Sequence, residues 1–98
     1  MIKEELVNKI SRRTGMESSH VLIFLEAFME EVKNKLGEGE PIHLRGFGSF
    51  LIKHRKQKTG RIITKKKSII IPAHNIPYFK PSDAFKEKVK NVIIEDEI

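Results

Sequence analysis

The chain has 98 residues, with 19 Lys or Arg against 13 Asp or Glu, a formal net charge of +6 and no cysteine. A chain of this length forms one domain and buries only roughly 60 % of the surface that its unfolded form exposes, so a lone copy is expected to be marginally stable. The absence of cysteine excludes disulfide cross-links and Cys-based metal sites. No signal peptide and no apolar run of about 18 residues are present, and we expect a soluble, cytoplasmic protein.

The charges are segregated along the chain. Ten of the Lys and Arg residues lie between Pro41 and Ser82, a range that contains no Asp or Glu, and the other nine share the rest of the chain with all 13 acids. Such segregation favours a polyanionic partner, with nucleic acid first and an anionic membrane surface second. The alternative is a solvated basic face without a ligand.

Two helices are predicted in the N-terminal part. Apolar residues at helical spacing indicate a first helix at residues 2–14, which ends at Gly15, and a second at about 18–36, where a serine can cap its start. The second helix is apolar over well over a third of its circumference. Burial on two sides is therefore expected, against the sheet of the same chain and against a second subunit, although the chain's own sheet could cover both stripes.

Strands and a short helix follow. Gly46 and Gly48 around Phe47 predict a tight hairpin with the phenylalanine directed into the core, and residues 69–71 are a β-branched strand signal. Tyr78 and Phe79 are expected core anchors. The chain is interpreted as one α+β domain, 1–98, with a helical part at 1–40, a sheet and arm at 41–76, a helix capped by Ser82 at 82–92 and an acidic tail at 93–98.

The basic excursion between these strands is too charged for a core. Residues 52–70 cannot all lie on a small body and keep their charges solvated, so we expect a projecting two-stranded arm that a ligand orders. Thr59-Gly60 is the best local turn signal for its tip.

Several motifs resemble the bacterial HU/integration host factor family. They are RGFGSF at residues 45–50, Arg55, Gly60-Arg61, IPA at 71–73 and PYFKPSDAFKEKV at 77–89, and the similarity covers about residues 1–91. The resemblance implies an intertwined dimer with a helical base and two β-ribbon arms that embrace DNA in the minor groove. It also implies a histone-like function in which the protein bends and compacts DNA in the nucleoid, with low sequence specificity and with apolar side chains wedged between base steps.

The arm departs from the family pattern. The family usually has Asn-Pro-x-Thr where this chain reads Ile62-Ile63-Thr64-Lys65. The proline that acts as a wedge in the family aligns with Ile63 of this chain. The glycine that usually follows in the family is replaced by Lys66. The resemblance places the tip near residues 62–64 rather than at Thr59-Gly60. A position that is often basic in the family is occupied by Asp83 in this chain, which removes one expected flanking contact with DNA.

The candidate DNA-binding residues are mostly Lys and Arg, which neutralise phosphates and release counterions. Those that match basic, DNA-contacting positions of the family are Lys53, Arg55, Lys58 and Arg61; further arm charges are Lys56, Lys65, Lys66 and Lys67; candidates outside the arm are Lys3, Lys80 and Lys86. Ile63 is the candidate wedge. The Ile62-Ile63 pair could also fill the strand or be an aggregation-prone segment guarded by the surrounding charges.

No catalytic constellation is found, so we expect no enzyme. The four histidines do not lie at metal-binding spacing and no paired carboxylates mark a cleft, and we expect no metal or cofactor. Alternatives to the histone-like function are a site-specific bender of the integration host factor type, an RNA-binding or ribosome-associated protein, and a protein-interaction module. The sequence does not separate a homodimer from a heterodimer.

Overall fold

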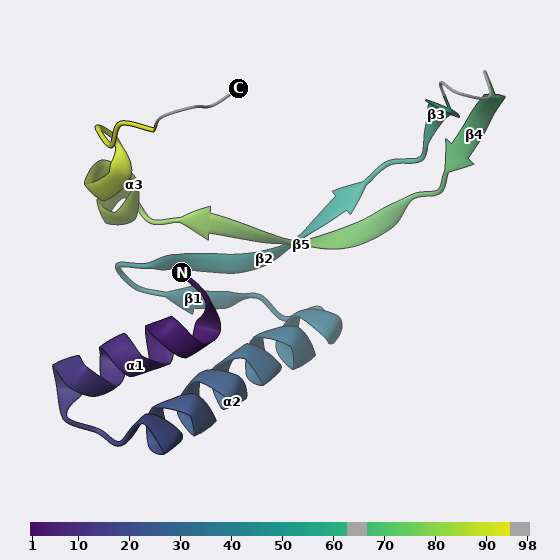
Figure 1. Ribbon diagram of the computed structural model, residues 1–98. Coiled ribbons are helices and arrows are strands. Elements are labelled where there is room, and N and C mark those ends of the chain that lie inside the picture. The colour runs from purple at the N-terminus through teal and green to yellow at the C-terminus, as the bar shows by residue number, and fades with distance from the viewer. Residues whose placement is uncertain (63–66, 95–98) are drawn as a thin grey trace.

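The computed structural model describes residues 1–62 and 67–94 and contains three helices and five strands in that part of the chain (Figure 1). The helices are α1 (Lys3–Thr14), α2 (Ser18–Gly37) and α3 (Asp83–Val89). The strands are β1 (Ile42–Leu44), β2 (Gly48–Arg55), β3 (Lys58–Ile62), β4 (Lys67–Ile71) and β5 (His74–Pro81). The expected α+β order is confirmed. Within the described residues, no helix combines the length and the apolar character that a bilayer crossing requires.

The helix boundaries differ from the sequence expectations in two places. The prediction that a serine caps α2 is wrong, because Glu17 occupies the N-cap position. The Glu17 carbonyl accepts from the N–H groups of His20 and Val21 at 3.0 and 3.1 Å. Helix α3 ends at Val89, short of residue 92. Its predicted cap is present, since the Ser82 hydroxyl accepts from the Phe85 N–H at 3.1 Å.

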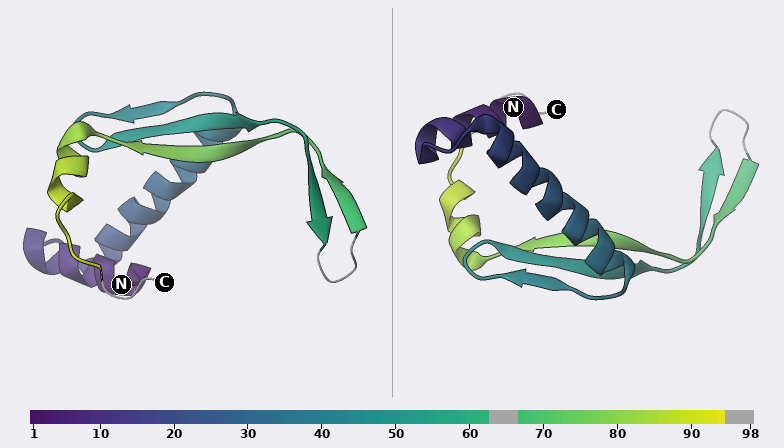
Figure 2. Two further views of the ribbon diagram at one scale, coloured as in Figure 1. Left: turned by 90° about the horizontal axis from the view of Figure 1, so that it is seen from above. Right: turned by 90° about the horizontal axis from the view of Figure 1, so that it is seen from below.

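A three-stranded antiparallel sheet in the order β1-β2-β5 forms the body, and β3 and β4 form a separate two-stranded ribbon. Helix α2 crosses one face of this sheet, and the ribbon extends away from the body (Figure 2). We call the β3–β4 ribbon the arm. The Cα radius of gyration is 18.7 Å, whereas a compact chain of about 100 residues has about 13 Å. The expected projecting arm is therefore confirmed.

The hairpin between β1 and β2 brings the aromatic residues together. Gly46 has a φ of 84°, which a residue with a side chain rarely adopts, and the Phe47 N–H donates to the Leu44 carbonyl at 2.9 Å to close the turn. The Phe47 ring stacks on Phe85 of α3 with centroids 5.4 Å apart. Ser82 locks this arrangement, because its N–H donates to the Phe47 carbonyl at 2.9 Å and its hydroxyl donates to the Gly46 carbonyl at 3.0 Å.

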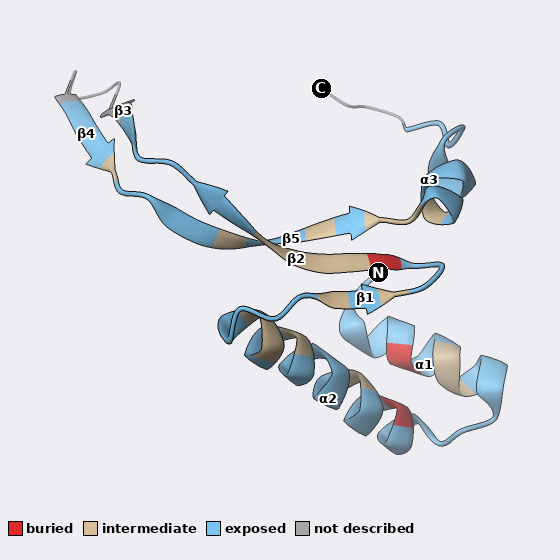
Figure 3. Ribbon diagram, turned by 180° about the vertical axis from the view of Figure 1, so that it is seen from behind, coloured by how far each residue is buried: buried red, intermediate tan, exposed pale blue. Residues whose placement is uncertain are grey.

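Few apolar side chains are buried in the single chain (Figure 3). Among the described residues only Val7 and Val21 are buried apolar side chains, each 5 % exposed. On α2, Ile23 and Phe24 are 62 % and 63 % exposed. The sheet of the same chain therefore does not cover both apolar stripes of α2, which excludes that alternative.

We predict that Gly48→Ala destabilises the fold. A Cβ atom at this position would lie 2.6 Å from the Lys80 carbonyl oxygen and 2.6 Å from a carbon of the Phe79 ring. Such overpacking costs about 1–3 kcal/mol of the free energy of unfolding, which urea denaturation measures. Gly37→Ala is the control, because nothing lies within 4 Å of its Cβ. Equal midpoints for the two variants would contradict the close approach of β2 and β5 at Gly48.

Candidate nucleic-acid interface

Strand alternation gives the sheet two different faces. Phe50 pairs with Phe79 across β2 and β5, their ring centroids lie 5.0 Å apart, and Phe50 also meets Phe28 of α2 at 6.2 Å. Because side chains alternate along a strand, every second residue of β2 from Phe50 faces α2, and Ser49, Leu51, Lys53 and Arg55 face away from it.

The outer face, as we call the side of the sheet turned away from α2, is basic. The pairing of β2 with β5 sets Ser49 opposite Lys80, Leu51 opposite Tyr78, Lys53 opposite Ile76 and Arg55 opposite His74, and β1 adds His43 opposite Ser49. All these residues belong to the stretch of sequence without Asp or Glu. The outer face therefore presents cations and hydrogen-bond donors without a competing carboxylate from its own strands.

Side-chain contacts order part of the outer face. The Lys53 ammonium lies 4.6 Å from the centroid of the Tyr78 ring, within the range of a cation–π contact. His43 Nδ1 lies 2.8 Å from the Ser49 hydroxyl, and His74 Nδ1 lies 2.9 Å from the Pro72 carbonyl oxygen. Lys53, Tyr78, His43 and His74 are all exposed, so the expectation that Tyr78 is a core anchor is wrong. The outer face is thus accessible to a large ligand.

The arm continues this surface beyond the body. Its ladder runs from the pair Lys58–Ile71 to the pair Ile62–Lys67, so Thr59 and Gly60 are paired strand residues and the turn cannot lie there. The side chains of Ile69 and Ile71 cover Gly60, since a Cβ atom at Gly60 would be 3.2 Å from Ile71 and 3.6 Å from Ile69. Ile70 belongs to the opposite face of the ribbon by alternation and is 68 % exposed. The arm therefore carries apolar surface as well as charge.

The predicted site residues fall into three groups. Lys53, Arg55 and Lys80 share the outer face, Lys56 and Lys58 lie where β2 passes into the arm, and Arg61 and Lys67 occupy backbone positions of the arm ladder. Ile63, Lys65 and Lys66 lie outside the described residues. The structure does not bring Lys3 and Lys86 onto the outer face, since they belong to α1 and α3.

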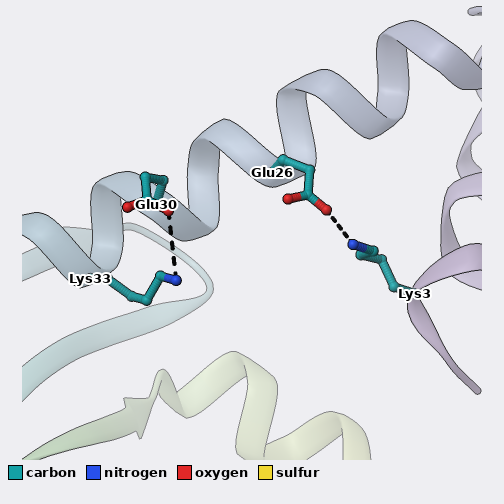
Figure 4. A network of polar contacts seen from close by, with 4 residues as sticks. All are labelled: Lys3, Glu26, Glu30 and Lys33. Carbon is teal, nitrogen blue, oxygen red and sulfur yellow. Dashed lines mark hydrogen bonds and ion pairs between the residues drawn. The ribbon is translucent and has the colours of Figure 1, made fainter.

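Lys3 has an acidic partner on the neighbouring helix. Its ammonium pairs with the Glu26 carboxylate of α2, and a second ion pair joins Glu30 to Lys33 at 3.6 Å on the same helix (Figure 4). The side chains of Lys3 and Glu26 are 52 % and 50 % exposed. Exposed pairs of this kind contribute at most about 1 kcal/mol, so a phosphate must compete with Glu26 but can displace it.

Sequence reasoning missed a polar pocket at the end of the sheet. A pocket of about 450 Å³ is lined by residues of β1, the hairpin turn, the start of β2, the end of β5 and the start of α3, among them His43, Arg45, Ser49, Lys80 and Asp83. The period-2 pattern leading to Lys53 could have identified Ser49. The pairing of Ser49 with Lys80 could not be predicted, because the register between strands that are distant in sequence has no local sequence signal.

The comparisons with known proteins agree on one family. The family profile described as Bacterial DNA-binding protein matches residues 1–90. The chain is 34 % identical over 90 residues to DNA-binding protein HU of Thermotoga maritima, covering 92 % of this chain and all of the relative. It is 32 % identical over 97 residues to integration host factor subunit beta of Xanthomonas campestris, covering 98 % of this chain and 94 % of the relative.

Solved structures show the same fold. An Anabaena HU–DNA cocrystal structure aligns with a TM-score of 0.87 and 31 % identity, over 93 % of this chain and 99 % of the other. HU from Thermotoga maritima aligns with a TM-score of 0.64 and 28 % identity, over 91 % and 98 % of the two chains. The resemblance seen in the RGFGSF, IPA and PYFKP motifs is confirmed, and this family comprises DNA-binding proteins, not enzymes. The chain belongs to the bacterial DNA-binding protein family that contains HU and integration host factor.

Proposed function

We propose that the protein is a histone-like architectural protein that binds duplex DNA in the minor groove, bends it and compacts it in the nucleoid. The observation that carries this proposal is the acid-free outer face of the sheet, which continues into a basic arm. Lys and Arg clustered on one face are the electrostatic signature of a protein that binds the phosphate backbone of a nucleic acid.

Low sequence specificity is part of the proposal. A protein that recognises its DNA sequence through the major groove commonly inserts a helix that carries base-contacting side chains. Here α2 packs against the opposite face of the sheet through the contact of Phe28 with Phe50. The outer face presents Lys and Arg, whose contacts with phosphates carry no sequence information. Site-specific binding of the integration host factor type is the second candidate, because relatives of both kinds match at similar identity.

A homodimer completes the proposal. Besides the uncovered residues of α2, an open apolar groove of about 930 Å³ runs between the end of α2 and the sheet, where Val32, Leu36, Phe50 and Ile52 are among its lining residues. Contiguous apolar surface of this kind is unfavourable in a lone chain. A second copy covers it with the same surface, as a two-fold axis requires.

We predict that the unfolding midpoint rises with protein concentration, because dissociation of a dimer accompanies unfolding. Sedimentation equilibrium is expected to give twice the mass of one chain. Phe24→Glu places a charge on the uncovered surface of α2 and should weaken the dimer. Lys9→Gln changes an exposed side chain of α1 that does not line the groove, and it should not weaken the dimer. A concentration-independent midpoint together with the mass of one chain would exclude the homodimer.

Binding to duplex DNA should depend strongly on salt. With roughly 6–10 phosphates engaged, the affinity falls by about 10³–10⁵ between 50 and 200 mM salt. Arg55→Gln removes a cation of the outer face, and it should lower the slope of log affinity against log salt by about 1 for each phosphate that is no longer neutralised. Fluorescence anisotropy with a labelled duplex measures both quantities.

Lys33→Gln is the matched control, since Lys33 lies on α2 and pairs with Glu30. Its salt slope should equal that of the unaltered protein. Competitors decide between the rival functions: nicked or gapped DNA should displace the labelled duplex more effectively than duplex RNA. Equal displacement by RNA would favour the RNA-binding alternative and count against the architectural function.

Bending is assigned to Ile63, which follows the last residue of β3 in the sequence and aligns with the family's wedge proline. Isoleucine is among the side chains that minor-groove binders insert between base steps. Ile63→Ala should reduce the bend of a doubly labelled duplex, as measured by resonance energy transfer, while salt-dependent binding persists. A bend angle that is the same for both proteins would leave Ile63 as strand filling.

A further inference from the structure

His74 lies where the body passes into the arm. It is the first residue of β5, it pairs across the strands with Arg55, and both residues are exposed. Directly opposed side chains on one face of an antiparallel pair lie about 5 Å apart at Cβ. The imidazole therefore belongs to the outer face, next to a cation that we expect to contact phosphate.

The orientation of the ring is set by a hydrogen bond within the chain. His74 Nδ1 lies 2.9 Å from the Pro72 carbonyl oxygen. A carbonyl only accepts, so Nδ1 carries the hydrogen and donates it. Nε2 is then the nitrogen that gains the proton when the ring becomes an imidazolium, and only the protonated Nε2 can donate to a phosphate oxygen.

The charges around His74 are positive. Arg55 lies opposite, Lys53 lies two residues along the same face of β2, and Lys56 and Lys58 follow in the link and in β3. The strands and their connections contribute no Asp or Glu. A phosphate that binds among these cations would favour the imidazolium form of His74 in the complex.

The other charged and titratable groups near this end of the sheet belong to the face toward α2. His54 is on that face, with Nδ1 2.8 Å from Asn75 Oδ1. Glu38 lines the apolar groove together with Asn75, and its carboxylate pairs with Lys35 at 3.6 Å. His54 thus provides a histidine of the same sheet on the opposite face.

We propose that His74 is a further DNA-binding residue that contacts a phosphate as the imidazolium, so that each chain takes up a proton from solvent at Nε2 when DNA binds. This inference rests on the proposed DNA-binding function. Linkage between proton and ligand makes the affinity for DNA rise as the pH falls, by at most about tenfold per pH unit for each engaged His74.

The experiment measures the affinity for a labelled duplex between pH 5.5 and 8.5 at constant ionic strength. The unaltered protein should bind more tightly at low pH. His74→Gln should remove a large part of this dependence, and His74→Lys, which keeps its charge throughout, should bind at pH 8.5 more tightly than His74→Gln. His54→Gln is the matched control and should keep the pH dependence of the unaltered protein.

Calorimetry counts the protons directly. Titrations of duplex into protein at one pH, in two buffers with different heats of ionisation, should show proton uptake that His74→Gln reduces and His54→Gln does not. Thermal unfolding verifies that both variants are folded. Equal pH dependence and equal proton uptake for His74→Gln and the unaltered protein would overturn the inference. Absence of duplex binding by the unaltered protein at every pH would instead overturn the proposed function.

Discussion

The pairing of β2 with β5 is the interaction on which the rest of the structure depends. With Phe50 opposite Phe79, the aromatic residues lie toward α2, and the same alternation turns Lys53, Arg55 and Lys80 to the outer face. A shift of one residue would exchange the two faces, burying the cations and exposing the phenylalanines. The close approach at Gly48, where any Cβ would meet Lys80 and Phe79, opposes such a shift. Core formation and the basic surface therefore arise from one register.

The single chain satisfies the hydrogen bonds of its buried polar atoms but leaves most of its apolar side chains unburied. Among the described residues no buried side-chain nitrogen or oxygen lacks a hydrogen-bond partner, but Val7 and Val21 are the only buried apolar side chains. A 98-residue chain that also extends an arm cannot enclose its own apolar surface. The proposed dimer resolves this conflict, because the groove beside α2 and the uncovered face of that helix are covered in the same step. The arm can then project from a base that is larger than one chain.

Local sequence signals predicted the elements well and the surface only in part. The apolar spacing of the first two helices, the Gly46-Phe47-Gly48 hairpin, the Ser82 cap and the strand of isoleucines were all readable, because each depends on residues close in sequence. The end of α3 was placed too late and the cap of α2 on the wrong residue, since frayed ends and backbone caps have weak signals. Thr59-Gly60 looked like a turn but lies in the arm ladder, where glycine fits under two isoleucines.

The sequence by itself determined the acid-free basic stretch, the family motifs and therefore a polyanion-binding protein of a known fold. The tertiary structure decided which cations lie on one face, because that depends on pairings such as Ser49 with Lys80 and Arg55 with His74 across distant strands. It also separated Lys3, which pairs with Glu26, from the outer face, and it brought two histidines of one sheet to opposite faces. Charge is a property of composition, whereas its arrangement on a surface follows from long-range strand register, which no local stretch of sequence encodes.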